Sequence, residues 1–120
     1  MSAGPILIVE DERDVREMLA ATLELSGHAV ITATDGAQAF NMARAHHPCL
    51  ILLDLMMPVM SGQEFRQAQL ANDEIRGIPV VVMSAHHEAR KIARQMNAAG
   101  CIPKPVDFDA LEKLVAQRCR

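Results

Sequence analysis

The sequence predicts an α/β fold, in which five parallel strands alternate with five helices in a doubly wound (βα)5 sheet. Short apolar runs without alternation are typical of strands buried on both faces of a parallel sheet. Between these runs lie stretches whose apolar residues recur at helical spacing. Right-handed crossovers would then place helices on both faces of the sheet. The apolar runs occupy residues 5–9, 49–53, 80–83 and 101–102.

The first half of the chain supplies two predicted strand–helix units. After the first apolar run, residues 13–26 have helical periodicity, and Gly27 ends that helix. The stretch 28–34, rich in Val, Ile and Thr, predicts the second strand. A turn at Asp35-Gly36 introduces a second helix over 37–46, with Ala37, Phe40 and Ala43 expected to face inward.

The second half continues the alternation. The third strand leads through a methionine-rich loop, 55–61, to a helix over 62–71 in which Phe65 and Leu70 are the expected anchors. A polar turn at 72–78 precedes the fourth strand.

The last two helices are predicted over 86–98, with Ile92 and Met96 inward, and over 107–119. Between them the fifth strand contains Pro103, which cannot donate a ladder hydrogen bond, so this strand should lie at an edge of the sheet.

Composition narrows the class of protein. The 120 residues are 50% hydrophobic and 22% charged, which favours one folded domain over a disordered chain. The net charge of -3 argues against direct nucleic-acid binding. Neither a membrane-length apolar run nor a signal peptide is evident, so we expect a cytoplasmic protein. No repeat or linker divides residues 1–120, and no output domain is expected within them.

The three cysteines are odd in number and have no CxxC spacing. We therefore expect reduced thiols, with Cys49 and Cys101 packed as small hydrophobic residues and Cys119 unpaired as well.

Polar residues follow the predicted strands where each one ends. Glu10 and Asp11 follow the first strand, Asp54 the third, Ser84 the fourth and Lys104 the fifth. Parallel strands end at one edge of a sheet, where open α/β sheets bind ligands. Three carboxylates there repel one another unless a hard cation such as Mg²⁺ relieves them. The lysine and the hydroxyl suit phosphate oxygens, and the lack of a glycine-rich phosphate loop argues against a nucleotide.

Simpler interpretations exist for each of these residues. The run Glu10-Asp11-Glu12 could only stabilise a helix N-terminus, Ser84 could only cap the next helix, and Lys104 could be an ordinary surface lysine. Their ordered positions at strand ends favour a shared site instead.

Other side chains are better explained as surface or packing residues. The histidine pairs at 46–47 and 86–87 are adjacent, so they are poorly placed to share a metal on a helix. The methionines of the loop are expected to pack there rather than to bind a metal. Arg90, Lys91 and Arg94 should form a solvated helix face.

Four motifs in order carry a family resemblance over almost the whole chain. They are ILIVEDE, ILLDLMMPVMSG, PVVVMSA and the pair Lys104-Pro105. The sequence resembles the receiver (REC) domain of two-component response regulators, including the chemotaxis regulators. The resemblance implies a flavodoxin-like sheet with strand order 2-1-3-4-5.

The resemblance also implies roles for the residues at the strand ends. Asp54 would be the phosphoacceptor, and Lys104 and Ser84 would contact the phosphoryl group. Mg²⁺ would be bound by Asp11, Asp54 and the backbone carbonyl of Met56, with Glu10 acting through a water. The Lys104-Pro105 bond would be cis.

The sequence departs from the family pattern near its end. Cys101 occupies the fifth-strand position where many members have an aromatic switch residue, and Val106 replaces a common Phe. Ala98-Ala99-Gly100 replaces an acidic pair of DNA-binding members. These departures predict a switch that depends more on Ser84, and a monomer or weak dimer.

The expected function is therefore a switch that receives phosphoryl from a phosphohistidine of a sensor kinase or phosphotransfer protein. It would alter binding of an unknown downstream protein through the last two helices and last strand. One alternative is a hydrolase with Asp54 as nucleophile, although Met56 stands where such enzymes carry a second acid. The other is an interaction module that accepts no phosphate, although no acid and no lysine has been lost.

Overall fold

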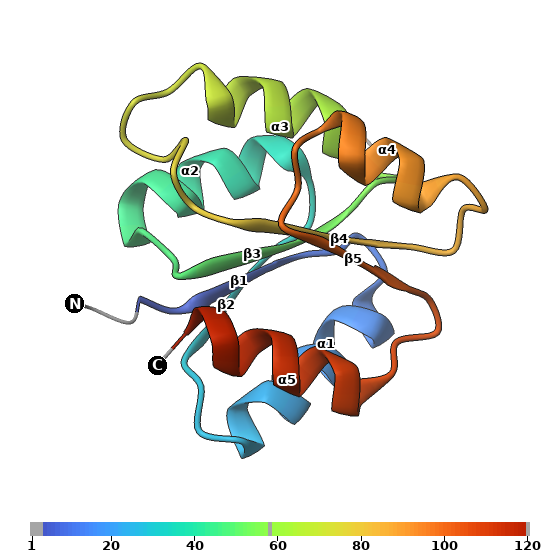
Figure 1. Ribbon diagram of the computed structural model, residues 1–120. Coiled ribbons are helices and arrows are strands. Elements are labelled where there is room, and N and C mark those ends of the chain that lie inside the picture. Colours follow the sequence, from blue (N-terminus) through green and yellow to red (C-terminus); the bar gives the residue numbers. More distant parts are fainter. Residues whose placement is uncertain (1–3, 58, 120) are drawn as a thin grey trace.

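The computed structural model describes residues 4–57 and 59–119 and has the predicted α/β architecture (Figure 1). Residues 1–3, 58 and 120, one of them in the predicted methionine-rich loop, lie outside the described part. The elements, in chain order, are β1 Ile6–Val9, α1 Arg13–Leu25, β2 Val30–Ala33, α2 Gly36–His46, β3 Leu50–Asp54, α3 Gly62–Leu70, β4 Val80–Ser84, α4 Ala89–Gln95, β5 Gly100–Pro103 and α5 Phe108–Arg118.

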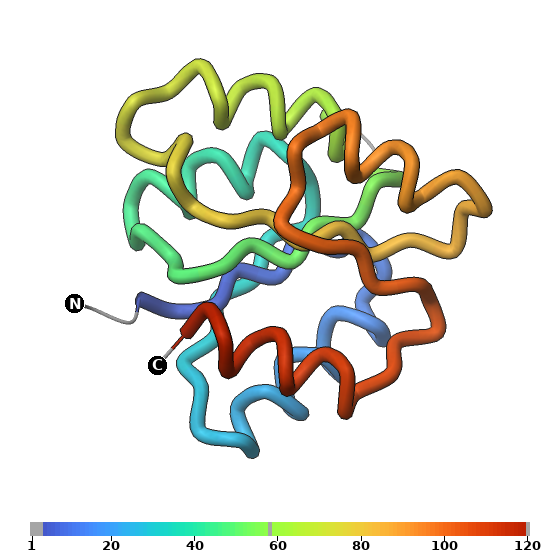
Figure 2. The backbone as a smooth tube through the Cα atoms, in the orientation of Figure 1, coloured from blue at the N-terminus to red at the C-terminus, as the bar shows by residue number. Residues whose placement is uncertain are grey.

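All strand pairs are parallel, and the order β2-β1-β3-β4-β5 confirms the expected topology. The tube in Figure 2 follows the chain from β1 outward to β2 and then back across the sheet to β3, β4 and β5. The strand that contains Pro103 lies at an edge, as its missing N–H donor predicts.

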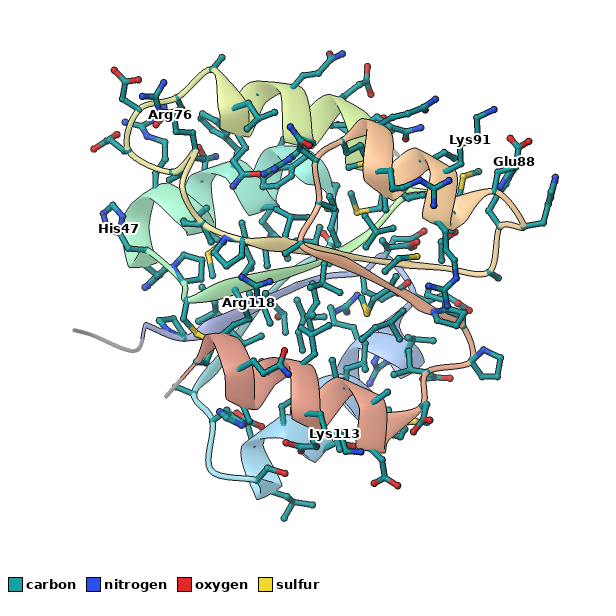
Figure 3. The ribbon with its side chains drawn as sticks, viewed as in Figure 1. His47, Arg76, Glu88, Lys91, Lys113 and Arg118 are labelled. Atoms are coloured by element: carbon teal, nitrogen blue, oxygen red, sulfur yellow. A yellow bond between two sulfur atoms is a disulfide. The ribbon has the colours of Figure 1, made fainter. Side chains whose placement is uncertain are left out.

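Helices cover both faces of the sheet in two layers (Figure 1). Alternate strand residues divide between these layers: Ile6 packs toward α1 and α5, whereas Leu7 packs toward α2, α3 and α4. β1, β3 and β4 are buried along their full length, which explains their continuous apolar sequence. Charged side chains such as Lys91 and Lys113 point outward (Figure 3).

One expected helical anchor, Leu70, does not face the core. Leu70 of α3 is 45% exposed, whereas Gln69 is fully buried. Gln69 lies four residues after Phe65 and therefore shares its inward face. Its amide donates to the carbonyls of Ile75 and Ile78 and so satisfies the turn beneath it.

Helix α2 begins at Gly36, and Ala39 rather than Ala37 is buried. A Cβ on Gly36 would approach the Met60 backbone oxygen to 2.9 Å, so close packing favours glycine here. The Asp35 side chain caps the helix by accepting from the Gln38 N–H at 2.8 Å.

Helix α4 is shorter than the predicted 86–98. The Ser84 hydroxyl accepts from the His86 N–H, and His86 Nδ1 accepts from the Glu88 N–H, both at 3.0 Å. Such local bonds compete with a helical turn, so the histidines precede α4. Asn97, with a φ of 56°, stops the helix at its other end.

The prediction of reduced thiols was wrong for two of the three cysteines. Cys49, just before β3, and Cys119, just after α5, form a disulfide with Cα atoms 5.6 Å apart. The two are 70 residues apart in sequence, so no local spacing announces the bond. Cys101 remains free.

Within the described residues, no helix has the length and apolar character needed to cross a membrane.

Candidate functional site

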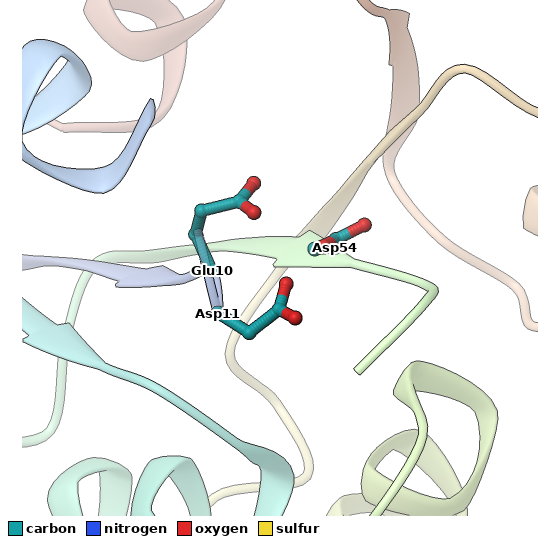
Figure 4. A group of neighbouring side chains, drawn as sticks. All are labelled: Glu10, Asp11 and Asp54. Atoms are coloured by element: carbon teal, nitrogen blue, oxygen red, sulfur yellow. The ribbon is translucent and has the colours of Figure 1, made fainter. Parts of the chain in front are cut away.

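Three carboxylates converge at the carboxyl edge of the sheet (Figure 4). Glu10 and Asp11 follow β1, and Asp54 is the last residue of β3. One oxygen from each lies within 4.8 Å of the others. Glu10 is fully buried and Asp54 is 4% exposed, whereas Asp11 is open to solvent. The clustering predicted from the strand ends is therefore present.

Lys104 reaches this cluster from the segment after β5. Its Nζ lies 2.7 Å from Glu10 Oε1 and 3.6 Å from Asp54 Oδ2. The Lys104 N–H donates to the Ser84 carbonyl at 3.1 Å, which fixes the lysine backbone against β4. The Lys104-Pro105 peptide bond is cis.

Burial of the Asp54 carboxyl and the negative charge of Glu10 raise the Asp54 pKa to about 7. The Lys104 charge and the Met56 N–H, which donates to Asp54 Oδ1 at 3.3 Å, oppose this rise. In the absence of a cation, a proton thus competes for the carboxylate at the centre of the site.

Burial alone would lower the pKa of Lys104, but the hydrogen bond to Glu10 and the charges of Asp54, Glu10 and Glu12 outweigh it, so the pKa is raised. The ammonium therefore stays charged beside the acids. A carboxylate paired with a lysine at 2.7 Å has one oxygen engaged, so Glu10 holds the lysine more directly than the resemblance implied.

Ser84 ends β4 and lines the same open cleft, which has a volume of about 540 Å³. The cleft is bounded by Glu10, Asp11, Glu12, Asp54, Met56, Ser84, Ala85, His86 and Lys104. The Met56 side chain is 69% exposed, and its carbonyl as a metal ligand stays a prediction.

Cys101 lies in β5 outside this cleft. It is half-buried and lines a neighbouring pocket with Ser84, His86 and Arg90. Burial raises the pKa of the Cys101 thiol, against the lowering effect of Arg90. A raised pKa keeps the thiol protonated and unreactive.

Arg16 belongs to the site but was missed in the sequence. It lies in the first turns of α1, and its Nη1 donates to the carbonyls of Glu10 and Asp11 at 3.0 and 3.3 Å. The signal was its position: a long side chain early in a helix points back toward the preceding loop.

The donor set fits a hard divalent cation. The three side chains offer only carboxylate oxygens, the ligand type that Mg²⁺ prefers, and the open cleft leaves room for waters and a phosphate. Burial of Asp54 and the charge of Glu10 raise the Asp54 pKa despite Lys104, and a bound cation would oppose both effects by favouring the ionised carboxylate.

Comparison with known proteins agrees with this geometry. The family model described as "Response regulator receiver domain" matches residues 6–116. The response regulator MprA of Mycobacterium avium is 35% identical over 115 residues, which cover 93% of this chain and 48% of that protein. The chain thus spans about half the length of the curated relatives it matches.

Solved structures show the same fold. Chemotaxis protein CheY4 of Vibrio cholerae has a TM-score of 0.87 at 28% identity, covering 98% of this chain and 99% of that one. The receiver domain of a signal transduction histidine kinase from Syntrophus aciditrophicus has a TM-score of 0.85 at 30% identity, covering 96% and 89%.

Proposed function

The chain belongs to the response regulator receiver domain family, and from this premise we propose that it is a phosphorylation switch whose acceptor is Asp54. One observation carries the proposal: the Asp54 carboxylate ends β3 in an open cleft, 3.6 Å from Lys104 Nζ and within 4.8 Å of two further acids. Asp54 also accepts from the loop that follows β3, through the Met56 N–H.

The proposed reaction transfers a phosphoryl group from a phosphohistidine nitrogen to an Asp54 oxygen. The N–P bond breaks, an O–P bond forms, and the released imidazole takes up a proton. Lys104 carries the positive charge that meets the phosphoryl oxygens, and its move from Glu10 toward the new group requires only a short shift within the cleft. Ser84, whose hydroxyl lines the cleft, donates to another phosphoryl oxygen.

Mg²⁺ would be held by Asp11, Asp54 and the carbonyl of Met56, near Glu10, and when bound it supplies positive charge that favours ionised carboxylates. The protein's own contribution is to hold Asp54 at a strand end and to keep Lys104 charged beside it. Hydrolysis of the acyl phosphate returns Asp54 to a carboxylate and resets the switch.

Signal output is proposed to pass through Ser84, the turn before α4, and the α4–β5–α5 face, with Cys101 in place of a larger switch residue. The donor would be a sensor histidine kinase or a histidine phosphotransfer protein in the cytoplasm. The target is a protein of unknown identity, and the receiver is a monomer or weak dimer before phosphorylation. Because this chain covers half of relatives such as MprA, the activity of a whole regulator remains part of the proposal.

The hydrolase alternative has less support. Met56 stands two residues after Asp54, and its exposed thioether offers no acid or base. Outside the three clustered acids, the lining residues of the cleft that could act as a general base are Glu12 and His86, and the Nδ1 atom of His86 already accepts from a backbone N–H.

The deciding experiment is phosphorylation by acetyl phosphate with Mg²⁺, followed by borohydride trapping and peptide mapping. One phosphoryl group per chain is expected, on Asp54. Asp54→Asn should abolish it, whereas Asp73→Asn, at an exposed carboxylate outside the cleft, should not. Label on another residue, or release of phosphate without a trapped aspartyl intermediate, would refute the assignment.

A further inference from the structure

Arg16 contacts the segment that joins β1 to α1, residues 10–12, through the backbone of that segment. Its guanidinium donates to the backbone carbonyls of Glu10 and Asp11 rather than to their carboxylates. Within the described residues, Arg16 forms no ion pair with any carboxylate, although three lie in the adjoining cluster. Arg16 thus does not occupy the side-chain oxygens that could bind a cation.

The three acids differ in how they are held. Asp54 accepts from Met56 and lies near Lys104. Glu10 accepts from Lys104 and from the Glu12 N–H at 3.2 Å. The Asp11 carboxylate has no hydrogen-bond donor in the described part of the chain, so its position follows from its backbone alone.

The backbone at Asp11 has few other restraints. Glu10 N–H still bonds to the Ala33 carbonyl at 3.0 Å, but Asp11 lies beyond the sheet. Glu12, the N-cap residue just before α1, makes no side-chain cap hydrogen bond. The contact from Arg16 therefore holds the carbonyls of Glu10 and Asp11, where the chain leaves the sheet before the helix begins.

We propose that Arg16 is a positioning residue that fixes the Asp11 backbone so that its carboxylate faces Asp54, and that this contact sets the affinity of the site for a divalent cation. The inference rests on the proposed function. It makes a prediction opposite in sign to simple electrostatics. Removing a positive charge near a cation site should strengthen cation binding by charge alone, whereas releasing the loop should weaken it.

The test is a Mg²⁺ titration of the unphosphorylated protein, in which the change of the amide chemical shifts reports Mg²⁺ binding. Arg16→Met should weaken Mg²⁺ binding by about tenfold, the lower end of the effect of outer-shell partners on metal affinity. Arg16→Lys should recover part of the loss, because an ammonium can still donate to one carbonyl.

Arg13 provides the matched control. It lies on the same helix, one turn earlier, and its side chain is 77% exposed in a pair with Glu17. Arg13→Met removes the same charge without touching the loop, and Mg²⁺ affinity should stay within about twofold of wild type.

Binding by Arg16→Met as tight as wild type, or tighter, would overturn the inference, as would an equal loss in Arg13→Met. If Arg16→Met does not fold, Arg16→Gln, also neutral and too short to span both carbonyls, is judged by the same criteria. Failure of the wild-type protein to bind Mg²⁺ would instead refute the proposed function, so the two failures are distinguishable.

Discussion

The two ends of the sheet differ in the interactions that they contain: clustered like charges at one end and a covalent cross-link at the other. At the carboxyl edge, three carboxylates share one cleft with a single lysine. At the other edge, a disulfide joins the residue before β3 to the end of α5. On the same side of the molecule, the Glu112 carboxylate of α5 accepts from the Ser26 hydroxyl, and its Oε1 atom lies 3.8 Å from His28 Nε2.

Strand β3 links these two regions, because Cys49 precedes it and Asp54 ends it. Like charges at one end destabilise the fold, while cross-linking at the other constrains the unfolded chain. A functional cluster can therefore be destabilising where the remainder of the same strand is firmly anchored.

The largest expected effect is at the cross-linked end. Reduction of the disulfide, or Cys49→Ser combined with Cys119→Ser, should lower the free energy of unfolding by about 4 kcal/mol, from the entropy of closing a 70-residue loop. Urea unfolding with and without a reductant measures it.

Cys101→Ser is the control for this experiment, since it removes the free thiol and leaves the bridge. Equal stability of the oxidised and reduced proteins would show that the apolar contacts between β3 and α5 hold this end without the disulfide. The two ends of the sheet would then differ less in their contribution to stability than we infer.

At the charged end, Asp54→Asn should raise the stability of the metal-free protein by on the order of 1 kcal/mol, because it removes a buried charge next to Glu10. Asp73→Asn, at an exposed acid, should have little effect. Thermal unfolding without Mg²⁺ compares them, and added Mg²⁺ should stabilise wild type more than Asp54→Asn. A lower melting temperature for Asp54→Asn would contradict the account of acid crowding.

The pH dependence gives a third test. The Asp54 pKa is about 7 in the folded protein against an ordinary value of 3.8, so the folded state binds the proton more tightly. Between these values the unfolded state holds fewer protons, and stability falls as the pH rises. Below 3.8 both states are protonated and this contribution is fully present.

Other groups titrate in the same range, so the informative quantity is the difference in unfolding free energy between wild type and Asp54→Asn. It should grow in favour of the variant from pH 4 to about 7 and then level off. Saturating Mg²⁺ should reduce the slope. A difference that stays flat across this window would mean that Asp54 is ionised in the folded protein throughout.

Much of the fold and the membership of the site followed from local sequence. Continuous apolar runs gave the strands, and the polar residue after each run gave the cluster of Glu10, Asp54 and Lys104. What failed depended on long-range geometry. No spacing signals the disulfide across 70 residues, and the choice of Lys104 to pair with Glu10 depends on how β1 and β5 end in space.

Other misses came from local bonds that override periodicity. Polar Gln69 is buried because its amide satisfies two carbonyls, which a hydrophobic pattern does not count. His86 stays outside α4 because Ser84 and Glu88 bond to it on either side.

The smallest expected effect concerns the route by which modification of Asp54 would be transmitted to helix α4. Ser84 lines the cleft, and its hydroxyl accepts from the His86 N–H, so it is coupled directly to the turn before α4. Cys101 lies outside the cleft as a small, half-buried thiol.

With beryllofluoride as a phosphoryl mimic, Ser84→Ala should leave Asp54 modifiable but reduce the amide chemical-shift changes of α4. Cys101→Ala should change them little, because it removes one sulfur atom and no hydrogen bond to the cleft. If Cys101→Ala abolishes the α4 response and Ser84→Ala preserves it, the signal travels through β5, and the cleft is coupled to the rest of the molecule by packing rather than by the Ser84–His86 hydrogen bond.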